Sequence, residues 1–206
     1  MQFYLASKSP RRKELLTEAG FDFEVILSSS SDSVDESVHP NEAPSDYVHR
    51  VTRAKALWGR SVVSDKPAAA VLAADTTVAL NGKIYGKPES RAEATRFLKE
   101  FSGKTHEVLT AVCLIDANGI PHEALSKTLV TFRALSPEEI EDYVSSKEPF
   151  DKAGGYGIQG RAGKFVVRTE GSYSGVIGLP LSLTKQLLAD QGIVPLSKKR
   201  TSCITL

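Results

Sequence analysis

The sequence contains very little cysteine and no long apolar run. Cys113 and Cys203 are the only cysteines among 206 residues, which is too few for a disulfide framework. The four histidines are scattered and show no ligand spacing with the cysteines, so the sequence does not predict a zinc site. No apolar stretch reaches the roughly 18 residues of a membrane-spanning helix, and MQFYLASKSP is too short and too polar for a signal peptide. We therefore expect a cytoplasmic protein that contacts no membrane.

The last residues allow one alternative to that expectation. Cys203-Ile204-Thr205-Leu206 formally fits a prenylation box behind a basic run. Thr205 is a poor match to the aliphatic position of such a box, and four-residue matches arise easily. A plain basic tail over 196–206 is the favoured interpretation.

The chain also lacks an excess of either charge. Lys and Arg total 26 against 25 for Asp and Glu, a net charge of +1. No overall field recruits nucleic acid, so any anion site must be a local cluster. With 41% hydrophobic residues, the chain can bury a sizeable core. We expect one domain over 1–195.

Helical and strand patterns are mixed along the chain. The helix 45–59 should bury Tyr47, Val48, Val51, Ala54, Leu57 and Trp58. The segment 28–44 is a Ser- and acid-rich loop, and 172–180 is a second loop. Long antiparallel-looking runs favour an α/β fold with a mixed sheet. Strands are expected at 2–6, 21–27, 68–80, 106–116, 123–135 and 164–171, and helices at 10–19, 45–59, 91–102, 137–146 and 180–190.

The run GGYGIQG contains the spacing G-x-G-x-x-G at Gly155, Gly157 and Gly160. A dinucleotide-binding turn must follow a strand and open a helix. This run follows a helix and leads into a strand, so its context excludes that function. Two interpretations remain: a sharply bent connector, or a loop whose backbone approaches a ligand, with Tyr156 and Gln159 as polar contacts.

The segment SKSPRR follows the first strand and opens the first helix. Pro10 suits the first helical position, and a helix N-terminus attracts anions through its free N–H groups. Arg11 and Arg12 add fork-shaped donors that match phosphate oxygens, and Ser7 adds a hydroxyl. The alternative is that one arginine simply faces solvent.

Asp75 lies inside an otherwise apolar strand, where a carboxylate is costly unless it is hydrogen-bonded, metal-bound or functional. A hairpin at Asn81-Gly82 should return Lys87 towards it. Lys55 flanks the buried stripe of the helix 45–59, where a solvated lysine is the default. Asp32, Asp35 and Glu36 in the acidic loop could help to hold a divalent cation, and the alternative is that at least two of them are simply solvated.

Five stretches together resemble the Maf family of nucleoside-triphosphate pyrophosphatases. They are LASKSPRRKELL, AADTTV, GKPES…EA…FLKEFSGKTHEVLTAV, EPFDKAGGYGIQG and GSYSGVIGLPL, in that order over residues 4 to 188. The resemblance implies a two-lobed α/β fold with a strongly curved mixed sheet and a deep central cleft, similar to that of inosine-triphosphate pyrophosphatases. It also implies a homodimer.

The resemblance further implies hydrolysis of a nucleoside triphosphate to the monophosphate and pyrophosphate, with Mg²⁺ or Mn²⁺ required. By position Asp75 would be the general base, with Lys55 and Lys87 as the motif lysines. An acid from the loop, one of Asp32, Asp35 and Glu36, would assist with the metal.

Three positions separate subgroups within that family. Arg11, Thr76 and Gln159 resemble the dTTP/UTP type, whereas the sister group acting on 7-methyl-GTP carries an aromatic residue, Gln and Glu there. Gln159 and Thr76 would then read the pyrimidine, with Tyr156 packed nearby. The competing hypothesis is a nucleotide-binding regulator of cell division that does not turn its ligand over.

Overall fold

The computed structural model describes residues 2–27, 34–66 and 70–196. Asp32, Cys203 and the tail 197–206 therefore lie outside the described residues. Among the described helices none is long and apolar enough to cross a bilayer.

A single mixed sheet runs through the molecule, in the order β2-β1-β3-β5-β6-β7, with β4 paired to β3. The β1 pairings to β2 and β3 are parallel and the others are antiparallel. The strands are β1 (Phe3–Ala6), β2 (Phe23–Ile26), β3 (Val71–Leu80), β4 (Lys83–Tyr85), β5 (Thr105–Ile115), β6 (Pro121–Phe132) and β7 (Val166–Glu170). The predicted α/β class with a mixed sheet is confirmed.

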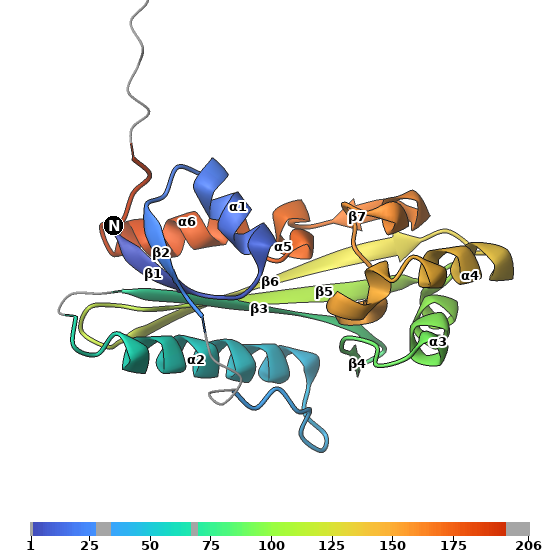
Figure 1. The fold of residues 1–206 in the computed structure, drawn as a ribbon, viewed down its shortest axis with the longest axis horizontal. Coiled ribbons are helices and arrows are strands. Elements are labelled where there is room, and N and C mark those ends of the chain that lie inside the picture. The colour runs from blue at the N-terminus through green and yellow to red at the C-terminus, as the bar shows by residue number, and fades with distance from the viewer. Residues whose placement is uncertain (1, 28–33, 67–69, 197–206) are drawn as a thin grey trace, which may run out of the picture.

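Helices cover both faces of this sheet. The α-helices are α1 (Pro10–Glu18), α2 (Pro44–Val62), α3 (Arg91–Phe101), α4 (Pro137–Ser145), α5 (Tyr173–Ile177) and α6 (Leu181–Asp190). Three short 3₁₀ turns carry the glycine-rich region: η1 (Glu148–Asp151), η2 (Ala153–Gly155) and η3 (Arg161–Phe165). Figure 1 shows α2 below the long strands and α1, α5 and α6 above them.

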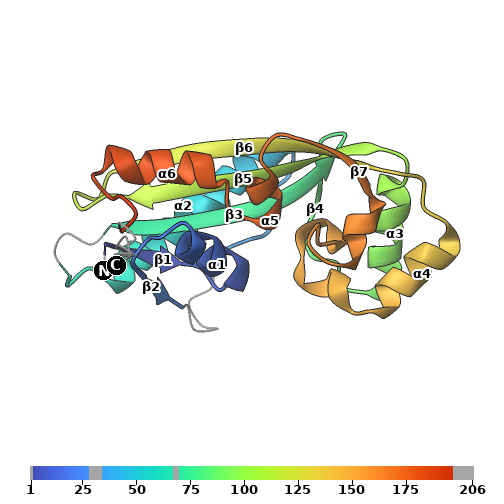
Figure 2. The same cartoon turned by 90° about the horizontal axis from the view of Figure 1, so that it is seen from above.

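The elements form two lobes, which lie at opposite ends of the long strands in Figure 2. In one lobe, α1, α2 and α6 sandwich the strands, with Leu72 and Leu114 facing one helical layer and Val71 and Cys113 facing the other. In the other, α3, α4 and the 3₁₀ turns enclose an aromatic cluster on the far ends of β3, β5 and β6.

Two predicted segments differ in the structure. The expected loop 172–180 contains α5, a five-residue helix whose N-cap Ser172 accepts a hydrogen bond from the Gly175 N–H. On α2, Leu57 is 50% exposed although it was expected to be buried. The buried line instead follows Tyr47, Val48, Val51, Thr52, Ala56 and Gly59. It turns towards the sheet at Gly59, where a Cβ would lie 2.8 Å from the Ala6 Cβ, so the helix approaches β1 closely.

Candidate active site

The candidate active site lies where one edge of β3 has no neighbouring strand. β1 pairs with that edge only at Val71 and Leu72, and β4 pairs with it only from Val78 to Leu80. β5 occupies the opposite edge from Val71 to Ala79. Residues 73–77 therefore have no strand partner on the open edge, and Asp75 lies in the middle of this gap.

The strand directions bring two loops into this gap from opposite ends. β1 runs parallel to β3, so the chain leaving Ala6 continues towards Asp75. β4 runs antiparallel to β3 and leaves Tyr85 opposite Val78, so the next residues also head towards the gap. Ser7 and Lys87 consequently line one cleft of about 790 Å³ together with Asp75.

Asp75 and Thr76 point to opposite faces of β3, because successive side chains alternate along a strand. Both are half-buried, while the other residues of β3 are buried. Asp75 faces α2, where its Oδ1 accepts a hydrogen bond from Lys55 Nζ at 2.7 Å. Thr76 faces α1 and accepts from Arg12 Nη2 at 3.2 Å. A ligand entering the open edge can therefore reach groups from both helical layers.

Lys55 joins two carboxylates from separate parts of the chain. Its Nζ lies 2.7 Å from Asp75 Oδ1 and 2.8 Å from Glu36 Oε1. Asp35 is engaged elsewhere, since its Oδ1 accepts the Ser37 N–H at 2.9 Å. Of the described acids in the loop, Glu36 is thus the one beside Asp75. Lys55 is a bridge between carboxylates rather than the solvated lysine expected by default.

The Arg12 guanidinium is fixed by three hydrogen bonds. Nε donates to the Gly178 carbonyl at 2.8 Å, Nη1 to Ser7 Oγ at 3.4 Å and Nη2 to Thr76 Oγ1 at 3.2 Å. Burial lowers the pKa of Arg12 and the carboxylate of Asp75 opposes that shift, but an arginine side chain remains charged at neutral pH. The structure therefore excludes a solvent-facing Arg12 and places a preoriented cation in the cleft.

The Thr76 hydroxyl belongs to a directed chain of hydrogen bonds. Thr110 Oγ1 donates its single proton to the Gly175 carbonyl at 2.8 Å, so the 3.0 Å contact between the two threonine hydroxyls uses the proton of Thr76. One lone pair of Thr76 Oγ1 then accepts from Arg12. Thr76 orients Arg12 in this way, and its predicted contact with the pyrimidine would have to use the remaining lone pair.

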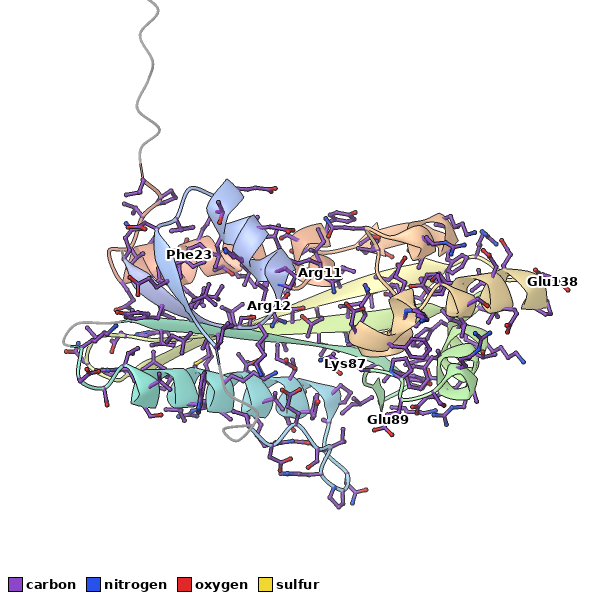
Figure 3. All side chains as sticks on the ribbon, in the orientation of Figure 1. Arg11, Arg12, Phe23, Lys87, Glu89 and Glu138 are labelled. Carbon is purple, nitrogen blue, oxygen red and sulfur yellow. The ribbon has the colours of Figure 1, made fainter. Side chains whose placement is uncertain are left out.

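Unlike Arg12, neither Arg11 nor Lys87 makes a side-chain hydrogen bond to another described residue. Both line the cleft, and Figure 3 shows them near Arg12 in the middle of the molecule. Arg11 also acts across the cleft. Burial on its own would raise the pKa of Asp151. The Lys152 ammonium and, after it, the charge of Arg11 outweigh that effect, so the pKa is lowered. These cations are available to an incoming anion.

The glycine-rich region brings Tyr156 and Gln159 to the same cleft. Gly154 (φ 71°) lies against β3, because a Cβ there would come within 2.8 Å of Val78 Cγ2. The Tyr156 hydroxyl lies 2.7 Å from His106 Nε2 in the aromatic core, where burial lowers the pKa of His106 to about 4. Tyr156 is buried and its hydroxyl is directed away from solvent, whereas Gln159 is exposed at the cleft.

All predicted site residues except Asp32 are therefore described, and all of these except Asp35 line one cleft. Sequence reasoning missed several residues that hold the site: His106, Thr110, Tyr143 and Glu148. His106, Thr110 and Glu148 lie in stretches that carry the family resemblance, but no local pattern distinguished their side chains. Their contacts depend on segments that are distant in the sequence.

The donors present fit a hard divalent cation only in combination with a substrate. The carboxylates of Asp75 and Glu36 face the same position, and the Lys55 ammonium occupies it. The described residues contain no cluster of three or more His, Cys, Asp or Glu side chains able to hold a metal. Mg²⁺ is commonly bound by one or two carboxylates together with substrate phosphates and water. The site therefore suits a metal that arrives with a phosphate compound.

Comparison with known proteins identifies the family. A family model described as Maf-like protein matches residues 2–191. The chain belongs to this Maf-like family. The predicted resemblance is thus confirmed, and the matched range includes the open edge of β3, the SKSPRR turn and the glycine-rich region.

Several proteins similar to this chain are named dTTP/UTP pyrophosphatases. The dTTP/UTP pyrophosphatase of Dechloromonas aromatica is 48% identical over 202 residues, which cover 95% of this chain and 100% of the relative. The dTTP/UTP pyrophosphatase of Cupriavidus pinatubonensis is 52% identical over 189 residues, covering 90% and 94%. A solved nucleoside-triphosphatase / dITP/XTP pyrophosphatase from Mycobacterium abscessus aligns at a TM-score of 0.42 with 15% identity, over 64% of this chain and 74% of that one. That structural likeness is too low to bear on the activity.

Proposed function

We propose that this Maf-like protein hydrolyses dTTP and UTP between the α and β phosphates, releasing the nucleoside monophosphate and pyrophosphate. CTP and modified pyrimidine nucleotides are further candidate substrates. The observation that carries the proposal is Asp75 on the open edge of β3, beside Lys55 and within the cleft lined by Arg12 and Lys87. Relatives named dTTP/UTP pyrophosphatase support the same reaction.

The cationic groups would bind the triphosphate. Arg12 offers a guanidinium held by Gly178, Ser7 and Thr76, and Arg11 and Lys87 add two further charges at the same cleft. The N-terminus of α1 adds backbone N–H donors, since the side chain of its N-cap Ser9 caps none of them. Preorganised charge around a phosphoryl group is the main catalytic contribution in such reactions.

Asp75 and Glu36 would hold Mg²⁺ or Mn²⁺ once a substrate brings its phosphate oxygens. Such a metal neutralises phosphate charge and activates water when bound. Lys55 contacts both carboxylates, so it would share these oxygens with the metal or turn towards the phosphates.

Asp75 would act as the general base for the attacking water. Its Oδ1 is held by Lys55, and a carboxylate has a second oxygen that can accept the proton of a water molecule. Asp75 is half-buried among the buried residues of β3, which limits the motion of its side chain, so the carboxylate is preoriented. A regulator that only bound nucleotide would have no need for a constrained base beside a cation.

Base selection would come from the glycine-rich loop. The Gln159 amide carries both a donor and an acceptor, which matches the adjacent N3–H and carbonyl groups of uracil and thymine. Tyr156 would pack near the base, and Thr76 would contribute through Arg12 as well as through its free lone pair. Homodimerisation and a cytoplasmic location stay predictions implied by the family resemblance.

Product analysis with a panel of triphosphates tests this function. We expect pyrophosphate and monophosphate from dTTP and UTP with added Mg²⁺ or Mn²⁺, turnover of ATP and GTP at least about tenfold lower in kcat/KM, and no turnover with chelator. Ion-exchange chromatography of the products gives the result directly. Release of inorganic phosphate instead would indicate a phosphatase, and binding without turnover would indicate a regulator.

A further inference from the structure

Gln159 stands at the centre of a tight turn between Gly157 and Arg161. The Gly160 N–H donates to the Gly157 carbonyl at 3.0 Å, which closes the turn. The Gln159 side chain is exposed and makes no hydrogen bond to another described residue. The direction of this side chain therefore depends on how the two ends of the turn are held.

Both ends of the turn are tied to one carboxylate, that of Glu148. At the far end, the Arg161 N–H donates to Glu148 Oε2 at 3.1 Å. At the near end, the Tyr143 hydroxyl donates to Glu148 Oε1 at 3.1 Å, and the Gly157 N–H lies close enough to that hydroxyl to lower its pKa. Tyr143 is fully buried. Burial raises its pKa, the carboxylate of Glu148 adds to this rise, and the Gly157 N–H opposes it. One acid thus holds the turn directly and through a buried tyrosine.

The space beneath the turn is shaped around the same carboxylate. A Cβ on Gly160 would lie 2.1 Å from Glu148 Oε1 and 2.9 Å from Oε2. A Cβ on Gly157 would lie 2.8 Å from Lys152 Cε. Neither glycine has a positive φ, so a side chain at either position would displace the Glu148 or Lys152 side chain rather than strain the backbone. The glycines of this run allow the turn to sit on Glu148 and Lys152.

Glu148 is itself held on a short, constrained segment. Its N–H donates to Ser146 Oγ at 3.3 Å, and its carbonyl accepts from Lys152 Nζ at 2.9 Å. The next residue, Pro149, is buried. The backbone that bears the Glu148 carboxylate is therefore fixed just after α4. The position of the turn then depends on the lobe that contains α3 and α4.

We propose that Glu148 is a positioning residue that sets substrate preference by fixing the Gln159 turn. This inference rests on the proposed function, because it assigns Gln159 to the base of a bound pyrimidine nucleotide. A carboxylate provides two acceptor oxygens, one for each end of the turn. Glutamine has one acceptor and one donor group, so in Glu148→Gln either the Arg161 N–H or the Tyr143 hydroxyl loses its acceptor.

Amide hydrogen exchange in the ligand-free protein tests the anchoring without any turnover. In Glu148→Gln we expect amide exchange to rise about tenfold at Arg161 or, through the Tyr143 hydroxyl, at Gly157, because one of the two donors loses its charged acceptor oxygen. In Tyr143→Phe only Gly157 should respond, since the Arg161 bond to Glu148 remains. Glu138→Gln is the matched control: Glu138 lies on α4 at the far end of the second lobe, away from the cleft (Figure 3). Unchanged exchange at both Arg161 and Gly157 in Glu148→Gln would overturn the proposal.

Nucleotide preference tests the consequence. We expect Glu148→Gln to reduce the ratio of kcat/KM for dTTP over GTP by about tenfold, through a higher KM for dTTP and a kcat within about threefold of the original. The ratio of Kd values measured without metal should fall in parallel. Faster exchange with an unchanged preference in both measurements would contradict a role in specificity. If the unaltered protein binds dTTP but does not hydrolyse it, the proposed function fails, while the exchange pattern and the Kd ratio still decide the role of Glu148.

Discussion

Replacing Asp75 with asparagine is expected to lower kcat for dTTP by at least about 10³-fold while leaving its binding nearly unchanged. Asparagine keeps the shape of the side chain but cannot take a proton from water, and loss of a general base alone costs 10²–10⁴-fold. Loss of one metal-binding oxygen adds to this effect. Binding should persist because Arg11, Arg12 and Lys87 are untouched. Single-turnover kinetics with excess enzyme, paired with calorimetric binding of dTTP in metal-free buffer, separates the two quantities.

The matched control for this variant is Glu89→Gln, the same chemical change at an exposed acid on the rim of the cleft (Figure 3). It should retain kcat within about twofold. If Asp75→Asn turned over dTTP at the rate of this control, Asp75 would not be the base, and the chemistry would have to be assigned to another group in the cleft.

The second large effect is expected at Arg12, where lysine keeps the charge but not the hydrogen bonds. One ammonium group cannot replace the planar fork that contacts Gly178, Ser7 and Thr76 together. Unsatisfied buried groups cost about 1–3 kcal/mol each, so we expect Arg12→Lys to lower kcat/KM for dTTP by about 10²-fold. Steady-state kinetics measures this loss, and thermal unfolding should show a lower midpoint because the Gly178 carbonyl loses its donor.

Arg11→Lys provides the comparison, since no hydrogen bond of the Arg11 side chain would be lost within the described residues. A point charge then substitutes well, and the loss in kcat/KM should stay below about tenfold. Lys13→Met, at an exposed position on the same helix, should leave the kinetics unchanged. Equal losses at Arg11 and Arg12 would show that the network around Arg12 has no special role.

Much of this arrangement could be predicted from the sequence because its signals are local. Ser136 and Glu139 have the spacing of a capping box at the start of the expected helix 137–146, and the structure contains that box at the N-terminus of α4. The apolar run around Asp75 predicted a strand with a conspicuous acid, and the expected strand is β3. The joint order of five motifs identified the family, which the match over residues 2–191 confirms.

The remaining features depend on pairings between distant segments. The gap along β3 arises because β1 and β4 end before they meet, and strand register is not encoded in either strand alone. The hydrogen bond from the Arg161 N–H to Glu148 joins residues 13 apart across two 3₁₀ turns and the glycine-rich loop. The exposure of Leu57 reflects the close approach of α2 at Gly59, which rotates the helix relative to the stripe that periodicity predicted.

The central claim is that water, aligned by Asp75, attacks the α phosphorus of a bound pyrimidine triphosphate. Hydrolysis of dTTP in ¹⁸O-enriched water, followed by mass spectrometry of both products, tests it most directly. We expect one ¹⁸O atom in the nucleoside monophosphate and none in the pyrophosphate, because the new P–O bond forms at the α phosphorus. Label in the pyrophosphate, or labelled inorganic phosphate as the product, would contradict it.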